Sequence, residues 1–376
     1  MVDLTPGARI TACRGCGGTD LDGVLDLGSQ AACDHFPPAD DPGPDPTWPL
    51  GLTMCRTCTL VQLDHVSPPE EEALAVESET LRRHAREVTA RIRERVTLPE
   101  QPRVREFSSH HGGSWIDAWL DGGATAVDAE ADLVLDNQSI IHSETLDADL
   151  AERVSALADD GVLAIEFHHA LRQVSGGQFD TVRHGHPLYF SLHAWTAAVE
   201  RHGLTVVDAW PEDVFGGCLL VVARRAGQDA DPSEAVQQIL RDEQAAEITS
   251  PAGYARLRDL ADTVRTDVVR HLEHARDEGR SVAAYGAGSK ASTFLGAADI
   301  GPDLLPYTAD LSPGKQGRRV PGVGVPIVSP EDLVRRNPDE VVILTWDIAA
   351  EVAAQLTAAG YRGRCLVPLP ALKQVE

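Results

Sequence analysis

Lysine is scarce in this sequence of 376 residues. Only three of its 33 basic residues are lysines, whereas 58 acidic residues give a formal net charge of -25. Because so negative a surface repels a phosphate backbone, nucleic acid is excluded as the partner. The scarcity also draws attention to Lys290 and Lys315, which both fall in glycine-containing loops.

Long apolar stretches are also lacking. No run approaches the ~20 apolar residues of a membrane-spanning helix, and the N-terminus "MVDLTPGARI" has neither the basic region nor the apolar core of a secretory signal. A hydrophobic content of 43% is that of a globular protein. We therefore expect a cytoplasmic protein that does not act on a membrane, with two or three domains for its length.

Four of the seven cysteines form two Cys-x-x-Cys pairs, in "ACRGCGG" and "MCRTCTL". Each such turn points two thiolates at one ion, and two turns complete a tetrahedral shell of four sulfurs. Thiolates favour zinc over magnesium or calcium, and a closed shell leaves no position for a substrate. The alternative is four unrelated buried cysteines. The spacing predicts a structural zinc site, with these ligands: Cys13, Cys16, Cys55 and Cys58.

The middle of the chain alternates strand-like and helix-like segments, which predicts a parallel-type α/β sheet. In such sheets ligands bind at the carboxyl ends of the strands. A single histidine there is more often structural than catalytic, but seven lie at or near successive strand ends. They predict an active cleft and are the following: His110, His111, His142, His168, His169, His184 and His186.

Several motifs together resemble the three-domain sugar C-methyltransferases, which act on nucleotide-linked deoxysugars in antibiotic pathways. The motifs are "CRGCGG…LDLG…MCRTCTLVQL", "RRHARE", "FDTVRHGHPLYFSL", "AYGAGSKASTFL" and "DLSPGKQGRRVPGVGVPIVSPEDL". The resemblance covers nearly the whole chain. It implies an α/β protein with a four-cysteine zinc module and following helix (1–98), a methyltransferase-like Rossmann fold (99–226) and a C-terminal Rossmann-like domain (227–376).

The resemblance also implies catalytic residues. The histidine that the family uses as base falls on His186, and a second active-site histidine falls on His142 of "DNQSIIH". The family's tyrosine in the first segment has become Arg183. We expect His186 to act as general base and His142 as acid or oxyanion partner, with His184 and Arg183 in support.

The site for S-adenosylmethionine (SAM) departs most from the family pattern. Glu106 is kept, but Ser108 stands where a glycine is wanted. Between Gly112 and the strand that begins near Asp132 there is room for one helix and one short strand, not for two crossover units of roughly 30 residues each. Asp128 is a remnant of the acid that holds the ribose. We therefore expect a degenerate site that does not use SAM.

In the C-terminal domain, "SVAAYGAGSKAS" reads as a strand, a glycine turn and the start of a helix, which together suit an anion. The glycine spacing falls short of a dinucleotide fingerprint, so NAD is not expected. By the resemblance, this domain helps to hold the nucleotide diphosphate of a sugar, and the alternative is that its lysines are solubilising surface charges. The predicted contacts are Tyr285, Gly286, Gly288, Ser289, Lys290, Lys315 and Arg318.

From these motifs we predict a SAM-independent isomerase, epimerase or ring-form mutase that acts on a nucleotide-linked, dTDP-type deoxysugar by histidine acid/base chemistry. One alternative is a SAM-dependent C-methyltransferase that acts on a dTDP-4-keto-deoxysugar. Another is a catalytically silent sugar-nucleotide-binding partner. The last places a second metal ion on four histidines, which are His168, His169, His184 and His186.

Overall fold

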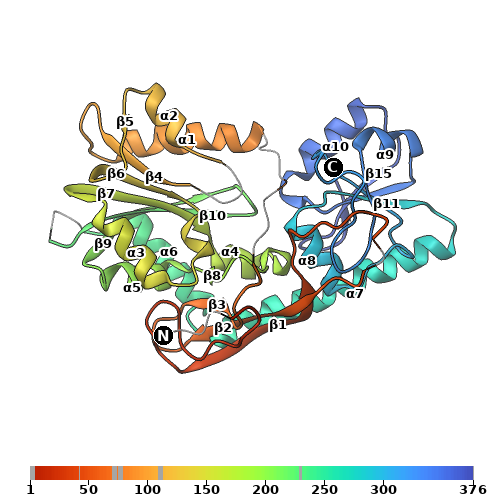
Figure 1. Cartoon of the computed structure of the whole chain (residues 1–376), viewed down its shortest axis with the longest axis horizontal. Coiled ribbons are helices and arrows are strands. Elements are labelled where there is room, and N and C mark those ends of the chain that lie inside the picture. Colours follow the sequence, from red (N-terminus) through yellow and green to blue (C-terminus); the bar gives the residue numbers. More distant parts are fainter. Residues whose placement is uncertain are drawn as a thin grey trace.

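The chain folds around three β-sheets, one for each predicted module (Figure 1). The structure, a computed structural model, describes residues 5–41, 43–69, 74, 79–108, 113–227 and 231–375. No helix among these residues is both long and apolar enough to cross a membrane. The α/β fold class expected from the sequence is confirmed, whereas the boundaries at residues 98 and 226 stay predictions.

The N-terminal sheet is built on a long antiparallel hairpin. Its strands β1 (Leu21–Ala31) and β2 (Thr47–Cys55) pair from Leu21 opposite Cys55 to Ala31 opposite Thr47. At roughly 3.3 Å per residue, β1 is on the order of 35 Å long. Figure 1 shows this hairpin running from the N-terminus along the base of the molecule toward the C-terminal domain. The hairpin thus carries the loop at its tip far from its cysteines.

Two short strands complete the N-terminal sheet. They are β3 (Val61–Leu63), which pairs with β2, and β8 (Leu188–Tyr189), which pairs with β3. Strand β8 comes from the middle of the sequence and directly follows the "RHGHP" turn. The pairing therefore attaches that turn to the N-terminal domain.

The middle sheet has six strands in the order β5-β4-β6-β7-β10-β9. Strands β5, β4, β6 and β7 are parallel, and β10 is antiparallel to both of its neighbours. The strand bounds are β4 (Arg103–Phe107), β5 (Thr125–Ala126), β6 (Ala131–Asn137), β7 (Leu157–His168), β9 (Leu204–Glu212) and β10 (Cys218–Arg225).

Helices cover both faces of this sheet because successive strand residues point to opposite sides. Leu133 and Leu135 pack with the helices of one face, whereas Val134 packs with those of the other. The first face carries α1 (Glu79–Arg95) and α2 (Ile116–Asp121). The second face carries α3 (Leu146–Ser155), α5 (Leu192–Glu200) and α6 (Glu234–Ala245), with the short α4 (Ala170–Ser175) beside them.

The connection between β4 and β6 is as short as the sequence predicts. It contains α2 and the two-residue edge strand β5, whose Thr125 and Ala126 are exposed. The expectation of one helix and one short strand is thus confirmed. Among the described residues, β5 is the edge strand of the sheet.

The C-terminal sheet has the order β13-β12-β11-β14-β15-β16, and all its strands but the last are parallel. Successive strands are added on one side of β11 up to β13 and on its other side from β14 onward. Doubly wound folds bind ligands at such a switch point. The strands are β11 (Val282–Tyr285), β12 (Thr308–Ala309), β13 (Ile327–Val328), β14 (Glu340–Ile343), β15 (Arg364–Val367) and β16 (Lys373–Gln374).

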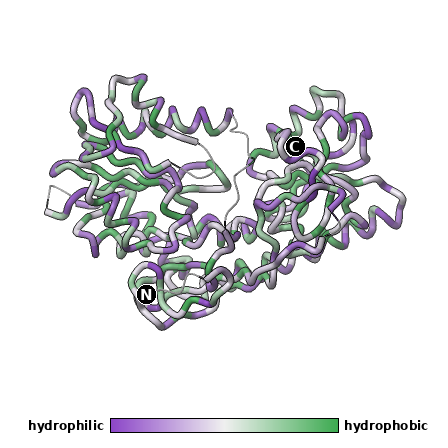
Figure 2. Tube along the Cα trace, viewed as in Figure 1, coloured by the Kyte–Doolittle hydropathy of each residue, from purple (hydrophilic) through white to green (hydrophobic). Residues whose placement is uncertain are grey.

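Helices α7 (Ala255–Asp277) and α8 (Ser289–Ala297) cover one face of this sheet, and α9 (Pro330–Arg336) and α10 (Ala349–Ala358) cover the other. Figure 2 shows apolar residues gathered on the strands of the middle and C-terminal sheets, with hydrophilic stretches on the outer helices. The apolar cores are continuous between domains, because the hairpin of the N-terminal sheet packs in one cluster with β11, α7 and α8.

Candidate active site

The four paired cysteines converge at the base of the hairpin. Their sulfur atoms lie within 4.8 Å of one another, with Cys13 Sγ 3.6 Å from Cys58 Sγ and Cys16 Sγ 3.5 Å from Cys55 Sγ. Backbone amides of Gly15 and Gly18 point at two of these sulfurs. In the described part of the chain, no other group of three or more histidine, cysteine or acidic side chains is so placed. The geometry fits one tetrahedral zinc ion.

Three of the predicted histidines meet between the middle sheet and the N-terminal sheet. His142 follows β6, His168 ends β7, and His186 lies in the turn before β8. The ring centroids of His142 and His186 are 4.7 Å apart at a right angle, and those of His168 and His186 are 5.7 Å apart. Burial, together with the charges of Lys290 and Arg183, lowers the pKa of His168 to about 3, so this ring is neutral at physiological pH.

Arg183 makes a buried link from this cluster to the N-terminal domain. Its Nη2 lies 2.6 Å from Nε2 of His186, and its Nη1 lies 2.8 Å from the carboxylate of Asp34. Its backbone amide donates to the Tyr189 hydroxyl in β8. The arginine that replaces the family's tyrosine therefore contacts the histidine pair directly.

His184 and His169 are directed elsewhere. His184 lies 3.1 Å from the carbonyl oxygen of Pro49, and burial lowers its pKa. His169 pairs with the buried carboxylate of Glu243 at 2.7 Å. Because these two rings are engaged with different elements, a second metal site that also includes His168 and His186 is not supported.

Replacing Glu243 by glutamine is expected to destabilise the protein by about 3 kcal/mol at neutral pH, because a buried carboxylate that is hydrogen-bonded to His169 and His193 is lost. Burial by itself raises the pKa of Glu243, but hydrogen bonds from His169 and His193 outweigh it and lower the pKa to about 2. The contacts of Glu243 therefore stabilise the fold fully above about pH 4.3, which is the pKa of glutamate in an unfolded chain. This stabilisation is lost as the pH falls toward 2.

Urea unfolding of the wild type and the E243Q variant at pH 7 and pH 3 measures this effect. The difference between the two proteins should shrink at pH 3. The matched control is E234Q, because Glu234 is an exposed carboxylate on the same helix. An equal loss of stability in both variants at pH 7 would contradict the assignment.

Lys290 joins the middle and C-terminal domains. Its Nζ lies 3.0 Å from Asp347 and 4.5 Å from the centre of the Trp346 ring, and it donates to the carbonyl oxygen of Phe215. Phe215 has a φ of 54° and packs its ring 5.7 Å from that of His168. The lysine that the sequence predicts as a phosphate contact is thus already ion-paired at the domain boundary.

The glycine turn after β11 is also partly occupied. Gly286 has a φ of 101° and approaches Thr345 so closely that a Cβ atom would lie 2.8 Å from that side chain. The next amide, of Ala287, donates to the carboxylate of Asp310. Gly288 and Ser289 then open α8. Because the Asp310 carboxylate already accepts from one backbone amide of this turn, fewer amides remain for a bound anion than the sequence predicts.

Lys315 is buried without an anionic partner among the described residues. It is 6% exposed and lies over the Phe36 ring at 5.0 Å, and no described residue provides a hydrogen bond or ion pair to its ammonium group. The neighbouring Arg318 differs, because it donates to the carbonyl oxygen of Phe36. A buried ammonium without a counter-ion is costly. Lys315 therefore marks a place where a bound anion would be stabilised.

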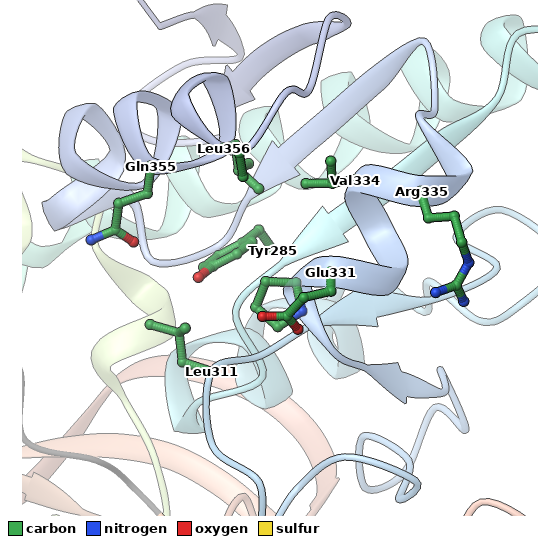
Figure 3. Close-up of a pocket in the computed structure, with 9 residues that line it drawn as sticks. Tyr285, Leu311, Glu331, Val334, Arg335, Gln355 and Leu356 are labelled. Atoms are coloured by element: carbon green, nitrogen blue, oxygen red, sulfur yellow. The ribbon is translucent and has the colours of Figure 1, made fainter.

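A pocket of about 370 Å³ lies on the other face of the C-terminal sheet, between α9 and α10. Figure 3 shows Tyr285 at its centre, with Leu311, Glu331 and Gln355 around it. Burial, helped by Asp310 and other nearby carboxylates, raises the pKa of Tyr285 to about 12, so its hydroxyl stays protonated. The pocket offers an apolar slot with a few polar groups, as small-molecule sites do.

The predicted SAM residues lie at the carboxyl edge of the middle sheet. Near the end of β4, the Glu106 carboxylate accepts hydrogen bonds from Ser114 and from the amide of Trp115, and burial raises its pKa. Asp128 is exposed just after β5. Two acids at the ends of adjacent strands fit the two polar parts of SAM, its amino acid and its ribose. Gly112, His110 and His111 lie outside the described residues.

Sequence reasoning missed the acidic partners of the site. Asp34 contacts Arg183, and Asp180 accepts a hydrogen bond from Trp346 while burial raises its pKa to about 7. Asp180 belongs to the quoted "FDTVRHGHPLYFSL" segment, so its place beside the histidines was a usable signal. No pattern in the sequence pointed to Asp34.

The fold and the site define an α/β protein whose N-terminal domain carries a four-cysteine cluster that fits zinc. Residues 13–72 match the family model of a zinc binding domain, and residues 213–370 match that of the C-methyltransferase C-terminal domain. The chain is 28% identical to the C-methyltransferase NovU of Streptomyces niveus over 405 aligned positions, which cover 96% of each protein. The chain is therefore similar to a C-methyltransferase over nearly its whole length, and this similarity supports an enzyme.

Solved structures resemble the chain more distantly. The 1,6-didemethyltoxoflavin-N1-methyltransferase of Burkholderia thailandensis is 17% identical, with a TM-score of 0.30 over 39% of this chain and 79% of that one. The mitomycin 7-O-methyltransferase MmcR is 18% identical, with a TM-score of 0.30 over 39% of this chain and 54% of that one. Likenesses of this size do not bear on the activity.

The relationship corrects two expectations. The prediction of a SAM-independent isomerase, epimerase or mutase is wrong, because the relative that matches from end to end is a C-methyltransferase and the C-terminal domain matches that family. The prediction that SAM is not used is wrong for the same reason. The shortened connection was confirmed, but it leaves the carboxyl ends of β4 and β5 in place with Glu106 and Asp128 beside them.

Proposed function

We propose that the protein is a SAM-dependent C-methyltransferase that acts on a nucleotide-linked keto-deoxysugar, with dTDP as the nucleotide. The observation that carries the proposal is the pair of His142 and His186, whose rings lie 4.7 Å apart at the carboxyl side of the middle sheet. Carbon methylation beside a ketone requires removal of a proton and stabilisation of the enolate that forms. Two adjacent imidazoles supply both functions.

In this proposal His142 takes the proton and the Nδ1–H of His186 stabilises the enolate oxygen, because Nε2 of His186 already accepts a hydrogen bond from Arg183, which adds a fixed positive charge. His168 is kept neutral by burial and forms one wall of the cluster. When bound, SAM supplies an electrophilic methyl group. Glu106 and Asp128 are the side chains that we propose to hold its amino acid and ribose ends.

The nucleotide end is proposed to lie in the C-terminal domain. Lys315 provides the charge for a diphosphate, with Arg318, Lys290 and the start of α8 near the same loops. The pocket around Tyr285 is of the right size and character for a nucleobase. Segment 33–36 touches both Arg183 and the Lys315 loop, so the two ends of one substrate could be held together.

Replacing Lys315 by methionine is expected to weaken binding of dTDP by about tenfold or more, because a charge-assisted contact to phosphate is lost. The same change should leave the free protein as stable as before or more stable, since it removes a buried charge that no described residue compensates. Calorimetric titration with dTDP and thermal melting without ligand measure the two effects. The control is K373M, because Lys373 is exposed at the end of the chain. Unaltered dTDP binding by K315M would contradict the site.

Calorimetry with SAM tests the cofactor assignment. We expect saturable binding to the wild type and a loss of about tenfold in affinity in the D128N variant, because a carboxylate that accepts two ribose hydroxyls becomes a weaker acceptor. The D121N variant is the control, since Asp121 is a nearby acid at the end of α2. Undetectable SAM binding by the folded wild type would overturn the proposed function.

A further inference from the structure

The tip of the hairpin, residues 32–41 and 43–46, lies where all three domains meet. On one side the carbonyl oxygen of Cys33 accepts a hydrogen bond from Ser292 in α8, and Arg319 of the C-terminal domain forms a buried ion pair with Asp45. On the other side Asp34 contacts Arg183 of the middle domain. The hairpin tip is therefore fixed from both sides.

The Asp34 contact reaches the histidine pair through one side chain. The Asp34 carboxylate lies 2.8 Å from Nη1 of Arg183, whose Nη2 lies 2.6 Å from Nε2 of His186. Cys33 Sγ also lies 3.5 Å from Nη1. Arg183 is buried, so water screens these charges little. Residues of the N-terminal domain thus contribute to the position of the guanidinium group.

The direction of the second hydrogen bond determines the state of His186. A guanidinium group has only donors, so Nε2 of His186 must be the acceptor and carry no proton. The proton of the neutral ring then sits on Nδ1. A second proton could be added only at Nε2, where it would meet a fixed positive charge. The contact therefore favours a neutral imidazole of a single tautomer.

We propose that Asp34 is a positioning residue of the active site, which holds Arg183 against His186 and so keeps that imidazole neutral and in the Nδ1–H form. The N-terminal zinc domain thereby takes part in the acid/base chemistry. Among the described residues, the groups that face the His186 ring include the Arg183 guanidinium, the His142 ring and the His168 ring.

The D34N variant separates this role from a simple change of charge. If Asp34 only contributed a negative field, its removal would make protonation of His186 harder. If Asp34 positions Arg183, its removal releases the guanidinium group and protonation becomes easier. The sign of the shift in the pH at which His186 titrates therefore distinguishes the two roles.

Side-chain ¹⁵N NMR of histidine-labelled protein measures that pH directly, with H186Q used to assign the signals. In the wild type we expect a neutral Nδ1–H ring that persists well below pH 6.5. In D34N we expect mixed tautomers and protonation at a higher pH, and in D34E a partial return to the wild-type behaviour. The control D40N changes an exposed carboxylate of the same hairpin tip and should leave the signals unchanged.

The activity arm of the test rests on the proposed function, whereas the NMR arm does not. With SAM and a dTDP-linked keto-sugar, D34N should lower kcat by about tenfold and move the acidic limb of the rate profile to higher pH. A lower or unchanged titration pH in D34N overturns the inference, whatever the activity. The predicted NMR shift in a protein that transfers no methyl group supports the inference and counts against the proposed function alone.

Discussion

The H186Q variant is expected to lose at least about 100-fold in the rate of methyl transfer, which is the usual contribution of a positioned acid or base. Glutamine is chosen because its side-chain oxygen can still accept the hydrogen bond from Arg183, so the fold around the site should survive. What is lost is the imidazole Nδ1–H that stabilises the enolate oxygen in the proposed reaction. The ring of His186 also packs against the rings of both His142 and His168, so its loss affects both of the other histidines in the cluster.

Transfer of a labelled methyl group from SAM to a dTDP-linked keto-sugar measures this loss, and calorimetry with dTDP shows whether binding survives. We expect binding to change less than about threefold, because the nucleotide contacts lie in the other domain. The control H274Q alters an exposed histidine on α7. Combining H186Q with H142Q should cost little more than H186Q alone if the two rings act as a unit. Full activity in H186Q would exclude the histidine pair as the catalytic group.

Replacing Cys55 by serine is expected to release the metal ion and to abolish activity. Structural zinc contributes on the order of 10 kcal/mol of apparent binding free energy to small domains, so its loss should unfold the N-terminal module. Cys55 is the last residue of β2 and pairs with the first residue of β1, so it lies at the base of the hairpin. Loss of the base should also release the hairpin tip with Asp34 from the active site.

Metal analysis should find one zinc ion per chain in the wild type and well under half of that in C55S. Limited proteolysis should then cut the variant within about the first 70 residues. The matched control is C365S, because Cys365 lies in β15 outside the cluster. A C55S variant with a full complement of zinc, or a wild type that holds two ions, would contradict the assignment.

The expectations that rested on local patterns agree best with the structure. The spacing within each Cys-x-x-Cys pair brings two sulfurs together within one turn, so the four ligands could be read directly from the sequence. Apolar runs and turn residues likewise indicated strands of the middle sheet and the strand before the glycine turn of the C-terminal sheet, and the residue count between β4 and β6 was right. From that count we concluded that SAM is not used. This conclusion was wrong because the length of a connection does not show which side chains remain at the strand ends.

The sequence by itself thus determined the zinc ligands, the alternation of strands and helices in the middle domain and the family motifs, because each depends on residues close together in the chain. Only the tertiary structure decided how the charged groups are paired. Arg183 meets Asp34 across 149 positions, whereas His184, two residues from His186, faces the hairpin instead. Lys290 is neutralised by Asp347, and Lys315 by no residue in the described part of the chain. Such differences arise because burial and the packing of distant segments, and not residue type, set which charge finds a partner.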